Sequence, residues 1–440
     1  MKTLCAPSSD TLAKSKEILK IAIPSGLSSF LDILNLSIVL LFVSMLSDSN
    51  IVAFGLGMNF LMLFYTFTNI FFTGSNTLIA RLHKTQPRQI GPLLFNLTLG
   101  NLLSSIPLFC LALVSFSSYL HWFGLNSGTL VLAHQFLEVL IFSIPAIMTK
   151  TTLTVSFAAT SKAHIPFYIK LFFTFFNLVL TYFLALGVGD LPQLGLVGAG
   201  IAGVITSYLE TFVLGFYAHK TFGIKQNWEF SQFFESVWIG LPTGIERGLT
   251  ILSLILTARF LASYNEEVLA GFQIGGRIEA FIFMPAFGFM VASMSLTAQN
   301  LVLKQYALID SYIRLSLFLS SSIMGVLGVL MAIFGTTLAQ IFTNRNDIIQ
   351  YASDYLIAVG LSQIPLVCIF VLDGLNRGAK KAKISLLIHT TSIWTLRIVP
   401  MYFCTLYYLP YYYLFVIIFA ETYLRAIAFW VAFKKSLWQV

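Results

Sequence analysis

Four ionisable side chains lie inside apolar stretches of this sequence where a lipid-facing helix should have none. Counted along a helix, Asp32 and Glu246 lie ~18 to 21 Å from one end of their stretches. Counted from the opposite end, Arg277 and Glu279 lie ~15 to 18 Å into a third stretch. A charge near the middle of a bilayer is costly unless it faces a cavity or a partner. A carboxylate at this depth can bind a proton, a sodium ion or an organic cation, so these residues are candidates for ion and substrate binding.

Glu246 has a particular neighbour in Pro242, which precedes it by one helical turn, whereas Pro24 lies eight residues before Asp32. Proline removes a backbone donor and kinks a helix, which opens polar backbone to water or to a coupling ion. Two roles therefore remain open for Glu246. It could carry a proton or bind sodium, or it could form a permanent ion pair with Arg277 or Arg247.

The other candidates also keep alternatives. Arg277 and Glu279 are two positions apart, so on a regular helix they point to nearly opposite sides. We expect Arg277 to pair with Glu246 and Glu279 to be structural. Asp32 is either a coupling or substrate-binding residue or a buried, hydrogen-bonded acid. Asp373 precedes a basic cluster and is expected at a membrane interface.

The elements that hold these residues are membrane-spanning helices. Of the 440 residues, 57% are hydrophobic and 10% are charged, and the mean hydropathy is +0.84. The apolar runs of about 20 to 30 residues are long enough for helices to cross a hydrocarbon layer of ~30 Å. The ten-residue alternation of a membrane β-barrel is absent. The sequence thus predicts an all-α integral membrane protein.

The apolar runs predict twelve spans. They lie at roughly 18–46, 51–80, 90–116, 129–158, 164–187, 194–218, 234–263, 267–297, 311–341, 350–376, 384–407 and 410–432. Lys and Arg gather in alternate connections, so the positive-inside rule places both termini in the cytoplasm. This topology accounts for the net charge of +8 without a nucleic-acid partner.

The sequence contains an internal repeat. Residues 24–82 align without a gap on residues 242–300, an offset of 218 positions, with Pro24 on Pro242. A match of this length, with the proline and several glycines in register, exceeds what shared hydrophobicity would give. Duplicated halves are common in transporters.

A second match extends the repeat, because Pro145 in the fourth span lies 220 positions before Pro365 in the tenth. Each half has six spans, and six is even, so both halves enter the membrane from the same side as a parallel repeat. The predicted domains are an N-lobe at residues 1–218, a cytoplasmic linker at 219–232 and a C-lobe at 233–440.

Enzymatic activity is not indicated. The sequence has no P-loop, no dinucleotide-binding glycine motif and no histidine spacing typical of a metal site, so no cofactor is expected. Aromatic residues make up 15% of the chain, with 42 Phe. Such residues could line a cavity suited to planar hydrophobic cations through cation–π contacts.

Several motifs resemble those of the multidrug and toxic compound extrusion (MATE) family. They are LPTGIERG at 241–248, AGFQIGGRIEAFIFMPAFGF at 270–289, LTAQN at 296–300 and DGLNRG at 373–378. The resemblance implies twelve helices in two six-helix lobes around a central V-shaped cavity. It also implies export of organic cations and drugs in exchange for protons or sodium.

The family's known site residues carry over unevenly. The first-span aspartate of relatives is replaced by Val39, and their fifth-span Asn and Asp correspond to Asn177 and Thr181. Their seventh-span glutamate corresponds to Thr250, one turn beyond Glu246. The resemblance therefore implies a depleted first-lobe site and favours coupling through Glu246.

These observations predict a secondary antiporter of the cell inner membrane, monomeric and surrounded by lipid, that exports small hydrophobic organic cations. Protons are the favoured coupling ion, sodium at Glu246 is the alternative, and Asp32 is the alternative first-lobe site. A second hypothesis is a flippase for lipid-linked saccharides, as in distant relatives of the superfamily. It requires a cavity basic enough for pyrophosphate, whereas the cations in the spans are few and matched by acids.

Overall fold

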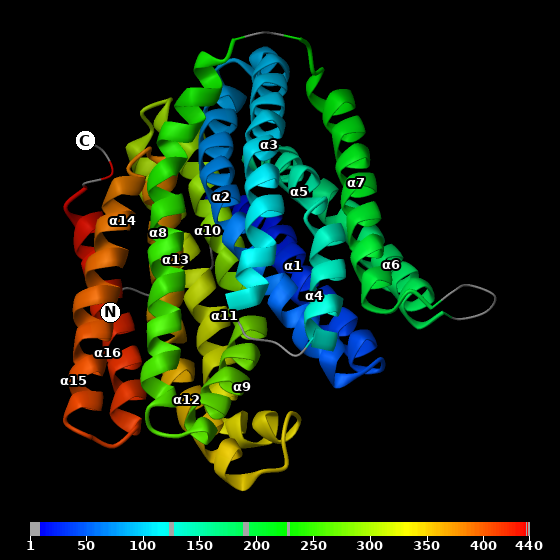
Figure 1. The fold of residues 1–440 in the computed structure, drawn as a ribbon. Coiled ribbons are helices and arrows are strands. Elements are labelled where there is room, and N and C mark those ends of the chain that lie inside the picture. The colour runs from blue at the N-terminus through cyan, green and yellow to red at the C-terminus, as the bar shows by residue number, and fades with distance from the viewer. Residues whose placement is uncertain (1–8, 123–126, 188–192, 227–228, 437, 439–440) are drawn as a thin grey trace. The chain divides into compact units, whose positions relative to one another are not determined.

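The computed structural model describes residues 9–122, 127–187, 193–226, 229–436 and 438, which form helices joined by short connections (Figure 1). The first half contains α1 (Ser9–Ser44), α2 (Asp48–Thr85), η1 (Pro87–Gln89), α3 (Ile90–Trp122), α4 (Ser127–Leu140), α5 (Ser143–Ala159), α6 (His164–Leu186) and α7 (Gly195–Phe222). The second half contains α8 (Ser231–Ala262), α9 (Glu266–Ile282), α10 (Met284–Leu301), α11 (Tyr306–Gln340), α12 (Asn346–Leu361), α13 (Gln363–Gly378), α14 (Ala382–Thr391), the π-helix η2 (Ser392–Ile398), α15 (Val399–Leu406) and α16 (Tyr412–Lys434).

These helices confirm the predicted fold class. In the described part of the chain, nine helical segments are long and apolar enough to cross a membrane. Three further pairs, α4–α5, α9–α10 and α12–α13, are bent by 44°, 47° and 53°. Counting each bent pair as one span gives twelve, as the sequence predicts. The protein is a multi-pass membrane protein.

Two of the bent spans break at matching places of the repeat. Proline cannot donate a hydrogen bond to the carbonyl four residues earlier. For Pro145 that carbonyl belongs to Ile141, and for Pro365 it belongs to Leu361. α4 ends at Leu140 and α12 ends at Leu361, so each helix stops where the proline withdraws the bond. The third bent pair also has a proline in the first turn of α10.

Pro24 and Pro242 lie inside the uninterrupted helices α1 and α8. The chain packs as two compact units that separate within these two helices, just after each proline. The first unit comprises residues 28–244, and the second unit combines the chain up to residue 27 with residues 245–440. The lobe boundary at 219–232 stays a prediction, and its residues 227–228 lie outside the described residues.

Within each unit, one helix crossing brings two backbones unusually close. In the first unit α8 crosses α2, and a Cβ atom added to Gly240 would lie 1.9 Å from the carbonyl oxygen of Ile70. In the second unit α1 crosses α10, and a Cβ atom added to Gly288 would lie 2.1 Å from the carbonyl oxygen of Ala22. Gly240 and Ala22 are 218 positions apart, as are Gly288 and Ile70, so the two crossings are equivalent in the repeat. Small residues permit such close approach between membrane helices.

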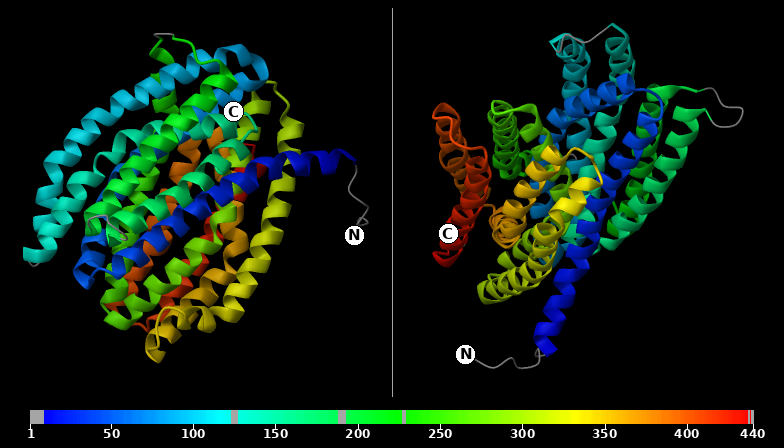
Figure 2. Two further views of the ribbon diagram at one scale, coloured as in Figure 1. Left: turned by 90° about the vertical axis from the view of Figure 1, so that its right-hand side faces the viewer. Right: turned by 90° about the horizontal axis from the view of Figure 1, so that it is seen from below.

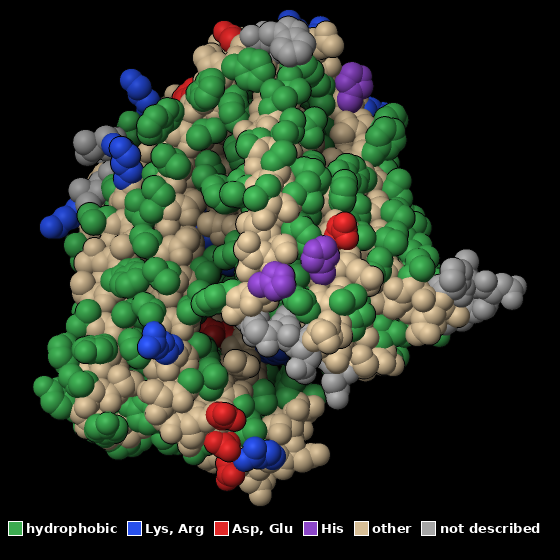
Figure 3. All heavy atoms as spheres, viewed as in Figure 1, with side chains coloured by type: hydrophobic (Ala, Val, Ile, Leu, Met, Phe, Trp, Pro, Cys, Tyr) green, Lys and Arg blue, Asp and Glu red, His purple; other side chains and the backbone are tan. Residues whose placement is uncertain are grey.

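The interiors of both units are largely apolar. The first unit has a core that includes Phe54, Phe136 and Leu137, and the second has one that includes Leu356 and Phe415. Hydrophobic side chains also cover much of the outer face shown in Figure 3. A surface of this kind is expected where lipid rather than water is the solvent.

Candidate functional site

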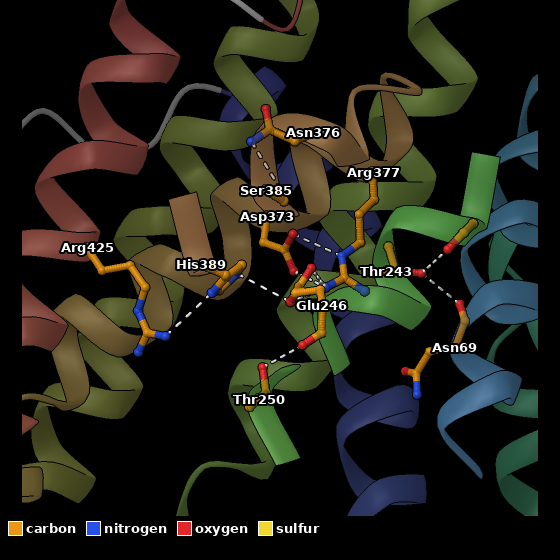
Figure 4. A network of polar contacts seen from close by, with 11 residues as sticks. Asn69, Thr243, Glu246, Thr250, Asp373, Asn376, Arg377, Ser385, His389 and Arg425 are labelled. Carbon is orange, nitrogen blue, oxygen red and sulfur yellow. Dashed lines mark hydrogen bonds and ion pairs between the residues drawn. The ribbon is translucent and has the colours of Figure 1, made fainter. Parts of the chain in front are cut away.

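Charged side chains from several helices meet inside the second unit, and Figure 4 shows the part around Glu246. We refer to these residues as the charge network. All lie on helices of the repeat's second half, and each side chain is buried or nearly so. The members are Glu246 on α8, Asp373 and Arg377 on α13, His389 on α14, Arg397 on η2, and Glu421 and Arg425 on α16.

Asp373 and Arg377 form a two-point ion pair one turn apart on α13. Arg377 Nε donates to Asp373 Oδ1 at 2.9 Å, and Arg377 Nη2 lies 2.7 Å from Asp373 Oδ2. A guanidinium that engages both oxygens of a carboxylate gives a strong and directional pair. Asp373 is only 3% exposed, so its pair with Arg377 is buried among the helices, and the expectation that it lies at the depth of a membrane interface stays a prediction.

Glu246 shares the same guanidinium. Arg377 Nη2 lies 3.2 Å from each of the two carboxylate oxygens of Glu246. The expected partners were Arg277 or Arg247, so the sequence identified a guanidinium beside Glu246 but assigned it to the wrong arginine. Arg277 is instead on an exposed side of α9. The true partner is 131 positions away in the chain, and no local pattern could reveal it.

His389 lies between Glu246 and Arg425. Its Nε2 atom is 3.6 Å from Glu246 Oε1, and its Nδ1 atom is 3.4 Å from Arg425 Nη1. The ring therefore links the two halves of the charge network. Sequence reasoning missed this histidine, although an imidazole inside an apolar run carries the same signal that identified Glu246.

Glu421 anchors the other end of the network and is fully buried. Arg397 Nη2 and Ser392 Oγ each donate to its carboxylate at 2.6 Å, and Arg425 Nε lies 3.3 Å away. Ser392 and Arg397 are five residues apart on η2, and the wider turn of a π-helix brings such residues to one side. Arg425 follows Glu421 by four positions on α16, so the two side chains lie one helical turn apart.

The three carboxylates of the charge network differ in how closely a guanidinium contacts them. It contains three carboxylates and three guanidiniums, and two close pairs form at 2.6 to 2.9 Å, Asp373 with Arg377 and Glu421 with Arg397. Glu246 is left with contacts of 3.2 Å or more. Among the three carboxylates, Glu246 is therefore the most loosely held. It could be neutralised by a proton while Arg377 keeps its pair with Asp373.

Arg377 would compete with a metal ion for the carboxylates of Glu246 and Asp373. Ligand atoms of Glu246, Asp373 and His389 lie within 4.8 Å of one another, and carboxylate oxygen with imidazole nitrogen suits several divalent metals. Arg377 Nη2, however, is already 2.7 Å from Asp373 and 3.2 Å from Glu246. A metal at these residues, or sodium at Glu246, would have to displace a guanidinium.

Two further candidates lie outside the network's ion pairs. Tyr355 on α12 donates its hydroxyl to Glu279 at 2.6 Å, which holds that carboxylate between two helices. Thr250 donates to the backbone carbonyl of Glu246 at 2.8 Å, one turn away on α8. Thr250 thus lies next to Glu246 without contacting its carboxylate.

In the described part of the first unit, two ion pairs join a lysine to a carboxylate on another helix. Lys170 Nζ on α6 lies 2.5 Å from Asp32 Oδ2 on α1, and Lys150 Nζ on α5 lies 2.6 Å from Glu210 Oε2 on α7. The Asp32 side chain is 63% exposed, so this acid is hydrogen-bonded, as one alternative expected, but it is not buried within its unit. Lys170 was missed although it interrupts the apolar run at 164–187.

Asn177 and Thr181 lie one turn apart on α6 and are both buried. Asn177 Nδ2 donates to Thr206 Oγ1 on α7 at 3.3 Å. This bond joins α6 to α7. Asp32 pairs with Lys170 and not with Asn177. Asn177 and the exposed carboxylate of Asp32 therefore have different neighbours.

The described part of the chain has nine to twelve membrane-spanning helices in two repeated halves, with charged side chains paired inside the spans. These features define the class of multi-pass membrane transporters. Comparison with known sequences makes the assignment specific. The MatE family model matches residues 24–183 and 242–403, so it matches once in each half and the two matches begin 218 positions apart. The chain belongs to this family, whose members are the multidrug and toxic compound extrusion transporters.

Curated relatives agree with this assignment. A probable multidrug resistance protein NorM of Thermotoga maritima is 27% identical over 229 residues, covering 51% of this chain and 49% of that protein. The chain thus spans about half the length of this relative in the alignment. A probable NorM of Synechocystis is 23% identical over 412 residues, covering 90% of this chain and 88% of that protein.

Solved structures share the fold. A Vibrio cholerae MATE transporter, VcmN, superimposes with a TM-score of 0.91 at 16% identity and covers 98% of each chain. A MOP superfamily transporter from Pyrococcus furiosus, described as having a binding pocket of reverse polarity, superimposes with a TM-score of 0.90 at 15% identity. That match covers 99% of this chain and 100% of the other.

Proposed function

We propose that this protein is a secondary active antiporter that exports organic cations and drugs in exchange for protons by alternating access. Glu246 is the residue that takes up the coupling proton. The observation that carries this assignment is that Glu246 shares Arg377 with Asp373 and makes the longer contacts. Protonation of Glu246 leaves the guanidinium paired, so no buried charge is stranded when the proton binds.

The same geometry favours protons over sodium. A proton binds to a carboxylate oxygen and needs no space of its own, whereas sodium requires several oxygen ligands. Arg377 Nη2 already contacts the carboxylates of Glu246 and Asp373, so it would compete with sodium for these oxygens. The replacement of the family's first-lobe acids by Val39 and Thr181 removes one known sodium arrangement as well.

The substrate cation is assigned to Asp32 in the first unit. Its carboxylate is more exposed than that of Glu246, at 63% against 11% of the side chain, and its partner Lys170 is a flexible ammonium. An organic cation can replace that ammonium at the carboxylate without leaving Asp32 unpaired. Aromatic side chains are abundant in the chain and suit the apolar part of such a substrate.

A flippase for lipid-linked saccharides has less support. Pyrophosphate recognition needs cationic groups that are free to face the ligand. Three cations inside the spans, Lys150, Lys170 and Arg377, are each paired with a carboxylate at 2.7 Å or less. We therefore retain cation export as the function, in a cell membrane with both termini on the cytoplasmic side.

Transport by proteoliposomes tests the proposal. Purified protein is reconstituted, and ethidium movement is measured under an imposed proton gradient, an imposed sodium gradient or neither. The wild type should respond to the proton gradient, and Glu246→Gln should lose that response. Glu279→Gln is the matched control, because it removes another carboxylate of the second unit that is bonded to a tyrosine. Full proton-driven transport by Glu246→Gln would refute the assignment.

A further inference from the structure

A small cavity lies between the first turns of α1 and α11, within the second unit and away from the charge network. Its volume is about 310 Å³, at the lower end of ordinary ligand sites. Figure 2 shows α1 in blue crossing the long helix α11 near its N-terminal end. The cavity is lined by Thr11, Lys14, Ser311, Arg314, Leu315 and Phe318.

The two helices are fixed against each other at this point. Lys14 Nζ donates to Ser311 Oγ at 3.3 Å, and Tyr312 donates its hydroxyl to the carboxylate of Glu17. These two contacts lie within one turn of each other on both helices. The walls of the cavity are thus held by side-chain bonds rather than by chance contact.

The lining is cationic at one level and apolar at the next. The six described lining residues include two cations, Lys14 and Arg314, and no acid. Asp310 binds Arg314 through Nε at 2.6 Å, which uses one of the five N–H donors of a guanidinium. The Arg314 side chain remains 60% exposed, so its other donors can reach an anion.

Phe318 follows Arg314 by four residues, which places it ~6 Å deeper along the helix on the same side. Phe318 is 69% exposed, and Leu315 also lines the cavity. A cationic rim above an exposed apolar wall matches a molecule with an anionic head and a hydrocarbon tail. Both helices begin at this level, so the rim lies where headgroups meet the apolar spans.

We propose that this cavity binds an anionic membrane phospholipid, with its phosphate between Lys14 and Arg314 and an acyl chain against Phe318. Clustered basic residues beside membrane helices recognise acidic headgroups in this manner. Thr11 and Ser311 add hydroxyl groups that can donate to phosphate oxygens. The bound lipid would hold the start of α1 on α11.

Native mass spectrometry of the full-length protein in detergent tests the proposal. Phosphatidylglycerol is titrated against phosphatidylcholine, with inorganic phosphate as a separate arm. The variant Lys14→Ala/Arg314→Ala should bind phosphatidylglycerol at least about tenfold more weakly than the wild type, since each charge contributes to headgroup attraction. The variant Lys84→Ala/Arg88→Ala removes the same charge from exposed positions of the first unit and should bind as the wild type does.

Three results would overturn the proposal. Equal weakening in both double variants would indicate a general charge effect, and unchanged binding in Lys14→Ala/Arg314→Ala would exclude the cavity. Saturation of the site by inorganic phosphate, with loss of phosphatidylglycerol binding, would identify a free-anion site instead of a lipid site. Arg314→Lys keeps the charge and should keep binding, which separates loss of the headgroup contact from loss of the fold.

Discussion

Exchanging Glu246 for glutamine should cost far less stability than exchanging Asp373 for asparagine, although both carboxylates contact Arg377. Arg377 offers Asp373 two nitrogens at 2.9 and 2.7 Å but offers Glu246 a single nitrogen at 3.2 Å. In Glu246→Gln the guanidinium keeps its stronger partner, so the loss is about 1.5 to 2 kcal/mol, the lower end of the range for a hydrogen bond to a charged group. In Asp373→Asn the buried pair itself is broken, which costs about 3 to 5 kcal/mol.

Thermal unfolding of the purified variants in one detergent measures this difference. At about 2 °C per kcal/mol for a chain of this size, Glu246→Gln should lower Tm by about 3 to 4 °C and Asp373→Asn by about 6 to 10 °C. Glu421→Gln is a second reference, because Glu421 is fully buried and bonded to Arg397 at 2.6 Å, so it should behave like Asp373→Asn. If Glu246→Gln lost as much stability as Asp373→Asn, Glu246 would be needed to hold Arg377 and could not be neutralised during transport.

Three further predictions concern other parts of the molecule. Asp32→Asn should raise KM for an organic cation about tenfold in proteoliposomes with little change in kcat, because a binding contact is lost; an unchanged KM would contradict the substrate assignment. Lys150→Met should cost about 3 to 5 kcal/mol by leaving Glu210 buried and unpaired, and adding Glu210→Gln should restore part of the loss in Tm; no recovery would argue against the pair. Gly240→Ala should cost about 1 to 3 kcal/mol, because its Cβ would meet a backbone carbonyl of α2 at 1.9 Å. In the control Gly248→Ala on the same helix, the Cβ meets nothing within 4 Å, so this variant should be neutral or stabilising. Equal Tm values for the two variants would contradict the close crossing.

The fold could be predicted largely because membrane helices follow simple rules of length and hydropathy. The predicted span at 90–116 corresponds to α3 at Ile90–Trp122, and the predicted span at 164–187 corresponds to α6 at His164–Leu186. The repeat could be detected because prolines and glycines serve backbone geometry and stay in register. In the sequence Pro145 and Pro365 indicate only the repeat, and the helix breaks at these prolines appear only in the structure. The first part of α1 belongs to the second unit, and the first part of α8 belongs to the first unit. This division depends on helix packing, which hydropathy does not encode.

The candidate site could be predicted only in part. The cost of burying a charge identified Glu246 and required a cationic partner near it. Choosing Arg377 required knowing that its side chain on α13 reaches Glu246 on α8, and only the structure supplies that contact. The spacing of Asp373 and Arg377 at four positions was a readable sign of a helical pair. Lys170 and His389 carried the same signal as Asp32, namely an ionisable group within an apolar run.

The proposed coupling requires Glu246 to release a proton when a cationic substrate binds. This release can be counted directly in weakly buffered detergent solution, with a pH-indicator dye and tetraphenylphosphonium as the added cation. The wild type should release about one proton per molecule of bound substrate, and Glu246→Gln should release none while still binding. Equal proton release by Glu246→Gln and the wild type would contradict the central claim and would assign the coupling proton to another residue.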